Sequence, residues 1–199
     1  MVNISIEKEL ATFTKNGLWG CIDKTGKEII PTNYHEIIFN YEVICAKYLN
    51  KWSVFNKNGK AISLIEYDSV GFLKEDILVV KLDMKWGFID KEGKEITSIK
   101  YDLVDYFTRG FARVMLDFNW GFINKNGNEI VPLIYHHVEN FKNGLARVEL
   151  ENKWGIINQN GTEVCPLRYK EIGPFSEGFA KVKLKYYCCL LYTSDAADE

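Results

Sequence analysis

The five tryptophans of this chain recur at a nearly constant interval. They are Trp19, Trp52, Trp86, Trp120 and Trp154, so the successive spacings are 33, 34, 34 and 34 residues. A fixed period in this range indicates a repeat protein, in which each unit buries apolar surface against its neighbours. Five units are enough to build a continuous shared core.

Other residues keep the same interval. A glycine follows the tryptophan in four units, with Ser53 as the exception: Gly20, Gly87, Gly121 and Gly155. Another glycine stands seven residues after each tryptophan: Gly26, Gly59, Gly93, Gly127 and Gly161. A tyrosine stands fifteen residues after it: Tyr34, Tyr67, Tyr101, Tyr135 and Tyr169. We expect the tryptophans and the glycines beside them to form the structural core of each repeat.

Helical repeats of the same length exist, but this sequence does not fit them. In the fourth unit, glycines and a proline interrupt the chain so often that two antiparallel helices cannot be drawn through it. In residues 145–150, apolar Ala146, Val148 and Leu150 alternate with charged Arg147 and Glu149, which is the periodicity of a strand. The pattern therefore predicts a β-repeat.

Each unit contains up to three predicted strands. The alternating segment is the first, and the second begins at the tryptophan, as in residues 120–124, where neither face carries a charge. We expect that strand to be buried on both sides, and Gly121 to leave room for a neighbouring aromatic ring or backbone. The third strand, residues 129–131, leads to Pro132, and the segment after the repeat tyrosine returns the chain to the next unit.

A turn separates the second strand from the third. It reads Asp23-Lys24-Thr25-Gly26 in the first unit and has Asp or Asn in front and glycine at the end in the others. Asp or Asn opens tight turns, and glycine accepts positive φ, so these carboxylates are predicted to form turns rather than an acid/base pair.

These residues resemble the bacterial WG repeat, which is named for its Trp-Gly pair. Residues 144–148 followed by 153–158 match its pattern nearly throughout, and the resemblance covers about residues 10–187. It implies an all-β array of five antiparallel hairpin or meander units of roughly 34 residues, with a truncated sixth. It also implies an interaction module, and no reaction or cofactor. The second unit departs most from the pattern, with Ser53 for glycine and Leu64 for proline.

The two ends of the chain fall outside the array. Residues 1–9 read as a lead-in. A sixth tryptophan is due at position 188, where the chain has Cys188, and the residues from Cys189 resemble translated sequencing-adapter sequence. We therefore expect residues 188–199 to be a non-native tail. Strand 179–184 would then lack a partner, and its open edge would favour self-association.

Composition excludes several classes of function. Twenty-five basic and 27 acidic residues give a formal net charge of −2, without the basic excess of a nucleic-acid-binding protein. No apolar run has the roughly 20 residues of a transmembrane helix. The first residues lack the pattern of a secretory signal, which favours the cytoplasm.

Sites of chemistry are not evident in the sequence. His35 and His136 follow the repeat tyrosine, where other units have Asp or Lys, which indicates a solvated position. Cys21 and Cys165 occupy positions that are apolar in other units, so we expect them to be small buried residues. No nucleotide, zinc or nucleophile motif occurs. We expect no catalytic residue, no metal and no cofactor.

Three hypotheses of function follow. The main one is a noncatalytic scaffold that binds a protein or peptide, because stacked repeats present extended surfaces. A second is a carbohydrate- or cell-envelope-binding module in which the row Tyr34, Tyr67, Tyr101, Tyr135 and Tyr169 stacks on sugar rings. A third is a spacer for an effector domain that this chain lacks.

Overall fold

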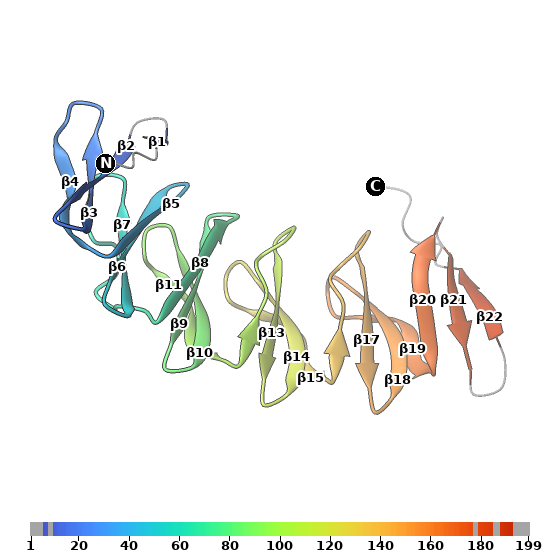
Figure 1. The fold of residues 1–199 in the computed structure, drawn as a ribbon. Helices are drawn as coiled ribbons and strands as arrows, with labels where there is room; N and C mark the ends of the chain where they lie inside the picture. The colour runs from blue at the N-terminus through green and yellow to red at the C-terminus, as the bar shows by residue number, and fades with distance from the viewer. Residues whose placement is uncertain (1–5, 8–9, 177–178, 185–187, 193–199) are drawn as a thin grey trace. The chain divides into compact units, whose positions relative to one another are not determined.

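The structure is a computed structural model, and it describes residues 6–7, 10–176, 179–184 and 188–192. The described residues form strands and turns and no helix, as the sequence predicts (Figure 1). The chain divides into two compact units. The first contains residues 1–101 and 106–108, and the second contains residues 102–105 and 109–199.

Six small antiparallel sheets follow one another along the chain, and we number them in that order. In the first unit, sheet 1 contains β1 (Ile6–Glu7), β2 (Leu10–Lys15), β3 (Leu18–Asp23) and β4 (Glu28–Tyr34). Sheet 2 contains β5 (Glu36–Asn40), β6 (Val43–Tyr48) and β7 (Lys51–Asn56). Sheet 3 contains β8 (Ser69–Lys74), β9 (Ile77–Leu82), β10 (Lys85–Asp90) and β11 (Glu95–Tyr101).

The second unit contains the other three sheets. Sheet 4 contains β12 (Leu103–Val104), β13 (Phe111–Leu116), β14 (Asn119–Asn124) and β15 (Glu129–Tyr135). Sheet 5 contains β16 (His137–Val138), β17 (Leu145–Leu150), β18 (Lys153–Asn158) and β19 (Glu163–Tyr169). Sheet 6 contains β20 (Glu171–Ser176), β21 (Phe179–Lys183) and β22 (Cys188–Tyr192).

A full sheet has four strands rather than the expected three. The segment after each repeat tyrosine does not merely return the chain, because it forms the first strand of the next sheet, as β12 and β16 show. The tyrosine itself ends the last strand and pairs directly with the tryptophan of the same sheet, as Trp120 pairs with Tyr135. The repeated aromatic residues are therefore cross-strand neighbours.

The glycine after the tryptophan permits a close approach of backbone. Between Trp120 and Phe122 the register with β15 shifts, because the partner strand bulges opposite Gly121. A Cβ atom built on Gly121 would lie 2.5 Å from the carbonyl oxygen of Val131, which no side chain tolerates. The predicted room beside the tryptophan is thus occupied by the neighbouring strand.

The second repeat shows what happens without this glycine. Ser53 replaces it, and the fourth strand of sheet 2 is reduced to two isolated bridges, Trp52 with Tyr67 and Phe55 with Ala61. Ser53 carries a Cβ atom at the position where glycine lets the last strand bulge inward in sheets 1, 3, 4 and 5. The repeat that departs most from the sequence pattern is therefore also the one with the least regular sheet.

The core lies between successive sheets within each unit. In the second unit, Phe122 and Tyr135 of sheet 4 pack with Ala146 and Val148 of sheet 5. Strand β14 buries Gly121, Phe122 and Ile123 in succession, which confirms that this strand is covered on both faces. Each sheet thus completes the core of its neighbour, as stacked repeats require.

The tyrosines of the repeat are buried more deeply than the tryptophans, which we expected to form the core. Four of the five tyrosines are buried and Tyr34 is half-buried. Among the tryptophans, Trp52 is buried and the other four are half-buried. The chain passes to the next sheet directly after the tyrosine, with the His136 N–H donating to the Glu149 carbonyl at 2.9 Å, and this crossing covers the ring.

The turns between the second and third strands form as predicted. All five turn glycines have positive φ, from 76° to 86°. The Asp23 carboxylate accepts hydrogen bonds from the Thr25 and Lys27 N–H groups, and this lowers its pKa, with the Thr25 hydroxyl as the largest contribution. Asn56, Asp90, Asn124 and Asn158 accept the same pair of N–H groups in their turns.

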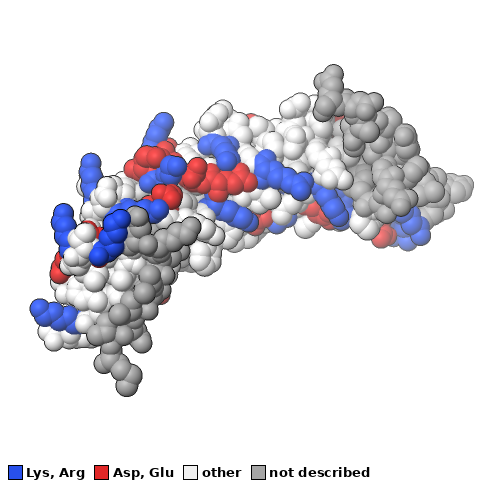
Figure 2. Space-filling model, turned by 90° about the horizontal axis from the view of Figure 1, so that it is seen from above, with Lys and Arg blue, Asp and Glu red and all other residues white. Residues whose placement is uncertain are grey.

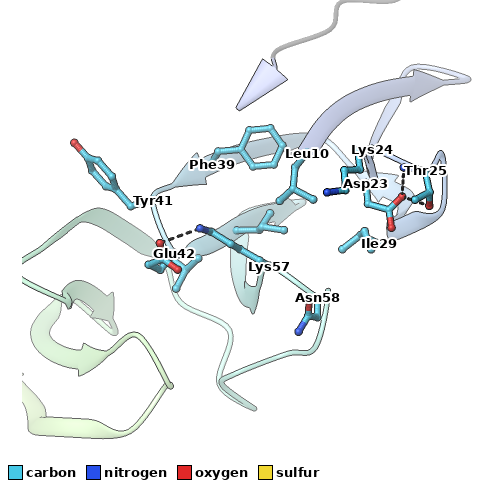
Figure 3. Close-up of a pocket in the computed structure, with 12 residues that line it drawn as sticks. Leu10, Asp23, Lys24, Thr25, Ile29, Phe39, Tyr41, Glu42, Lys57 and Asn58 are labelled. Carbon is cyan, nitrogen blue, oxygen red and sulfur yellow. Dashed lines mark hydrogen bonds and ion pairs between the residues drawn. The ribbon is translucent and has the colours of Figure 1, made fainter. Parts of the chain in front are cut away.

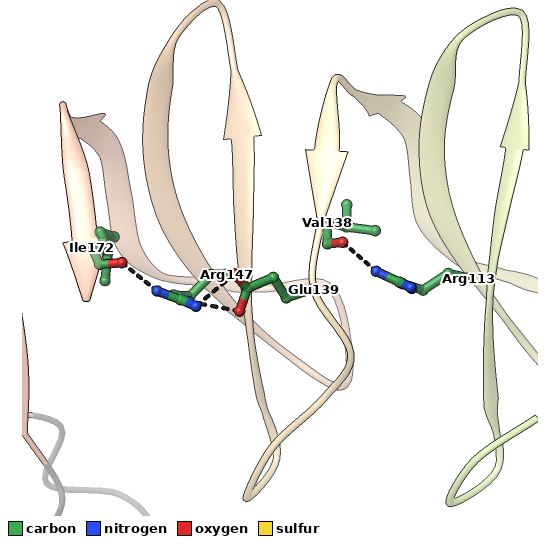
Figure 4. A network of polar contacts seen from close by, with 5 residues as sticks. All are labelled: Arg113, Val138, Glu139, Arg147 and Ile172. Carbon is green, nitrogen blue, oxygen red and sulfur yellow. Dashed lines mark hydrogen bonds and ion pairs between the residues drawn. The ribbon is translucent and has the colours of Figure 1, made fainter. Parts of the chain in front are cut away.

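Arginine side chains join neighbouring sheets of the second unit (Figure 4). Arg147 of β17 binds both carboxylate oxygens of Glu139, at 2.8 and 2.5 Å, and also donates to the carbonyl of Ile172 in sheet 6. Arg113 repeats this arrangement one period earlier, with Asp105 at 2.6 Å and the Val138 carbonyl of sheet 5 at 2.8 Å. A guanidinium suits this role because its donors point in several fixed directions.

The expected open edge on strand 179–184 is not observed. Strand β22 pairs along β21, with Lys183 opposite Cys188, which is the register of Glu149 and Trp154 one period earlier. Cys188–Tyr192 thus takes the place of a sixth tryptophan strand, because its apolar residues stand in the right register to pair. Residues 193–199 of the expected non-native tail lie outside the described residues.

Candidate interaction surface

The hairpin turn in front of the tryptophan strand is short and has an unusual backbone. In sheets 1, 3, 4 and 5 it consists of two residues that both have positive φ, as in Asp83 (48°) and Met84 (67°), or Asp117 (49°) and Phe118 (63°). Two-residue turns of this type favour Asn-Gly or Asp-Gly, because only small residues adopt the left-handed region cheaply. A large side chain there costs about 1 kcal/mol.

Large apolar side chains nevertheless occupy some of these turns, and they are exposed. Phe118 is 83% exposed and Met84 is 77% exposed. Leu49, in the equivalent turn of sheet 2, has φ 51° and is also exposed. The cost of the left-handed backbone is therefore not offset by burial within the described part of the chain. Such a combination points to a function outside folding.

The residue after the repeat tyrosine caps this turn. The Asp83 N–H donates to Asp68 Oδ2 at 2.8 Å, and the Asp117 N–H donates to Asp102 Oδ2 at the same distance. The Leu49 N–H donates to His35 Nδ1 at 3.1 Å. The interpretation of this position as merely solvated is incomplete, because three of its side chains hold the turn of the same sheet. The signal in the sequence is weak: this position holds Asp or His in four of the five repeats, and both side chains can accept a hydrogen bond.

The end of sheet 4 near Phe118 is apolar at three positions that are polar in the neighbouring repeats, except for Met84. Leu103 is 48% exposed and Ile134 is 45% exposed. Both lie at the same end of the sheet as the turn, on its two edge strands and on opposite faces. Leu103 shares a face with Met115, Trp120 and Tyr135, and Ile134 precedes Tyr135 and therefore points to the other face. We call Leu103, Phe118 and Ile134 the apolar end of sheet 4.

The same three positions differ in the sheets before and after. Sheet 3 has Ser69, Met84 and Lys100 there, and sheet 5 has His137, Asn152 and Arg168. Because the backbone is equivalent in all three sheets, folding does not require apolar residues at these positions. The apolar end of sheet 4 is thus a feature of one repeat rather than of the repeat pattern.

Three of the tryptophans have a cation over the ring. Lys47 lies 5.4 Å from the ring centre of Trp52, Lys81 lies 5.0 Å from that of Trp86, and the guanidinium of Arg113 lies 5.6 Å from that of Trp120. These contacts explain how half-buried rings are accommodated, since a cation over an indole ring is favourable.

The tyrosine row does not form the predicted ligand platform. Tyr67, Tyr101, Tyr135 and Tyr169 are buried, so their rings cannot stack on a sugar. The hypothesis of a carbohydrate-binding module that uses this row is wrong for these four residues. Burial also raises the pKa of the Tyr135 hydroxyl.

The remaining candidate groups for chemistry are structural. Cys21, Cys45 and Cys165 are buried, and burial raises the pKa of the first two thiols to about 11 and about 12. Within the described residues, no three His, Cys, Asp or Glu side chains are grouped as a metal site would require. Figure 2 shows acidic and basic side chains side by side on the face in view. The described residues contain no helix that is long and apolar enough to span a membrane.

Successive four-stranded sheets built on one recurring Trp–Tyr pair define an all-β repeat protein. The family model for the WG containing repeat matches residues 19–52, 52–86, 86–117, 120–154 and 154–188, so the chain belongs to the WG repeat family. No curated protein matches the chain in sequence.

Solved structures are similar only in outline. Hsv2p of Kluyveromyces lactis is 14% identical, with a TM-score of 0.39 over 98% of this chain and 75% of that one. A eukaryotic initiation factor is 10% identical, with a TM-score of 0.43 over 96% and 61%. PorZ of Porphyromonas gingivalis, a surface component of the type-IX secretion system, is 10% identical, with a TM-score of 0.38 over 90% and 29%. These similarities carry no inference about function.

Proposed function

We propose that this WG repeat array is a noncatalytic scaffold that binds a protein or peptide partner through the apolar end of sheet 4. The observation that carries the proposal is Phe118, a large apolar side chain that is exposed and held in the left-handed region. A residue that costs stability and gains no burial is explained by a partner that covers it. Leu103 and Ile134 add exposed apolar surface at the same end of the sheet, one on each face.

The neighbouring repeats supply the control for this proposal. Asn152 stands in sheet 5 where Phe118 stands in sheet 4, with a similar φ of 60°. A photo-crosslinking phenylalanine analogue at position 118 should form adducts in extracts of the source cells, and the same analogue at position 152 should not. Excess unlabelled protein should suppress the adducts, whereas excess Phe118→Gly protein should not.

Two results would contradict the proposal. Equal yields of adducts at positions 118 and 152 would mean that a partner does not bind the apolar end of sheet 4 in preference to sheet 5. Suppression of the adducts by Phe118→Gly protein would mean that the aromatic side chain is not the contact. A chain that serves as a passive spacer for another domain would form no specific adduct at either position.

A further inference from the structure

A large cleft opens between sheets 1 and 2 of the first unit (Figure 3). Its volume is about 920 Å³, and its floor contains Leu10, Ile29, Phe39 and Ile44 from four different strands. Lys24 and Lys57, each from the turn after a tryptophan strand, lie at its rim. A concave apolar site with a few polar groups at its edge has the character of a small-molecule site, and its volume is within the usual range.

Two aromatic rings that pack between sheets 4 and 5 are missing at the equivalent place between sheets 1 and 2. Between sheets 4 and 5, the ring of Phe141 packs 4.4 Å from Phe122 and 5.1 Å from Phe111, measured between ring centres. Between sheets 1 and 2 the three equivalent positions are Phe39, Cys21 and Leu10, because Phe39 precedes the Asn40–Val43 pair as Phe141 precedes the Lys142–Leu145 bridge. The interface between these two sheets therefore keeps the ring of Phe39 and lacks the other two.

Asn40, the residue after Phe39, does not fill the space of the two missing rings, because its side chain binds the next sheet. Its amide donates to the Gly71 carbonyl at 2.8 Å, and its oxygen accepts from the Leu73 N–H at 2.7 Å. Phe55 stands where other repeats have isoleucine, and it packs edge-on against Tyr34 at 5.9 Å, near the tryptophan end of the interface. The space toward the turns stays open.

The charges at the rim are not equivalent. The Asp23 carboxylate accepts hydrogen bonds within its own turn and is fixed there. Lys57 pairs with Glu42 at 2.9 Å, but both side chains are about half exposed, at 50% and 53%. An exposed pair of this kind is weak. Lys57 can therefore exchange the Glu42 carboxylate for an anionic group of a ligand.

We propose that this cleft binds a small amphipathic molecule, with an aromatic ring in the space of the missing phenylalanines and an anionic group at Lys57. This site lies in the other unit from the apolar end of sheet 4 and does not depend on the function proposed for that surface. A ring fits this place because sheet 4 fills the two equivalent positions with the rings of Phe111 and Phe122.

Two fluorescent probes with related rings test both parts of the proposal. Anilinonaphthalene sulfonate has aromatic rings and an anionic group, and phenylnaphthylamine is its neutral relative. Both should bind the full chain saturably at one site. Lys57→Gln should weaken binding of the sulfonate by about fivefold and leave the neutral probe within twofold. Glutamine is the native residue at this turn position in the fifth repeat, Gln159, so folding tolerates it.

Filling variants show where the probes bind. Cys21→Phe and Leu10→Phe each install the ring that sheet 4 carries at the same position, and each should abolish binding of both probes. Lys125→Gln, the equivalent lysine of sheet 4, is the control and should change neither affinity. If both filling variants fold, as circular dichroism shows, and still bind the probes as the unaltered chain does, the site is wrong. Absence of saturable binding also overturns the proposal, and an equal loss of both probes in Lys57→Gln overturns the anionic contact.

Discussion

At the scale of single residues, each repeat depends on a few positions where one atom decides the outcome. The glycine beside the tryptophan is one, because its missing Cβ lets the last strand of the sheet bulge against it. Thr97 is another, since it occupies the position of Val131 and Cys165 in the bulged strand. Its Oγ1 is buried and has no hydrogen-bond partner among the described residues.

Replacing Gly121 by alanine should destabilise the chain by about 1–3 kcal/mol, the usual cost of overpacking. The new methyl group would lie 2.5 Å from the Val131 carbonyl oxygen, so backbone must move. Ser53→Ala is the matched control, because that repeat already accommodates a Cβ, and it should change stability by less than about 0.5 kcal/mol. Urea denaturation measures both, and similar effects of the two substitutions would contradict this account of the glycine.

Thr97→Val should stabilise the chain by about 1–2 kcal/mol. The substitution keeps the shape of the side chain and removes a buried hydroxyl that lacks a partner. Val131 shows that valine fits the same position of another repeat, where it is fully buried. Thermal and urea denaturation are the measurements. A loss of stability would show that the hydroxyl is satisfied in solution.

At the scale of strands and sheets, the sequence pattern predicts the repeat, the turn glycines and a tryptophan strand that is covered on both faces. It does not predict the fourth strand, because β12 and β16 are two residues long and carry no periodicity of their own. The pattern also does not reveal the pairing of Trp120 with Tyr135. A bulge lies between this pair and the next one, Phe122 with Val131, and it shifts the register. Burial of Tyr135 and Tyr169 then follows from packing against the next sheet, which no single repeat reveals.

The candidate surface was equally hard to predict. The sequence shows that Phe118 and Met84 are large and apolar, but their exposure and their positive φ are properties of the folded turn. The turn-capping role of Asp68 and Asp102 also requires the register of the sheet, because each lies 15 residues from the N–H group that it accepts. What the sequence does show is that the apolar residues break the repeat pattern.

Arg147→Lys should destabilise the second unit by about 1–2 kcal/mol. A lysine cannot bind both oxygens of Glu139 and the Ile172 carbonyl at once, so one buried or half-buried acceptor loses its donor. Hydrogen exchange should localise the loss to sheets 5 and 6. Unchanged exchange in sheet 6 would mean that the arginine does not join the sheets.

At the scale of the whole molecule, stability should fall at alkaline pH. Burial raises the pKa of the Cys21 and Cys45 thiols from 9.0 to about 11 and about 12. The unfolded chain therefore releases these protons first, so their contribution is complete below about pH 9 and is lost as pH rises toward the folded values. Cys45→Ala should reduce the loss of unfolding free energy between about pH 9 and 11. Urea denaturation at several pH values measures it, and the same dependence of unfolding free energy on pH in both proteins would contradict the prediction.

The central claim is that a stable β-repeat scaffold carries Phe118 for binding and not for folding. The most direct test is the free energy of unfolding of Phe118→Gly, because glycine adopts the backbone of this turn without cost. The account predicts a gain of about 0.5–1 kcal/mol. Asn152→Gly should gain less, since asparagine already tolerates the left-handed region. A loss of stability in Phe118→Gly would show that the ring supports the fold and would contradict the claim.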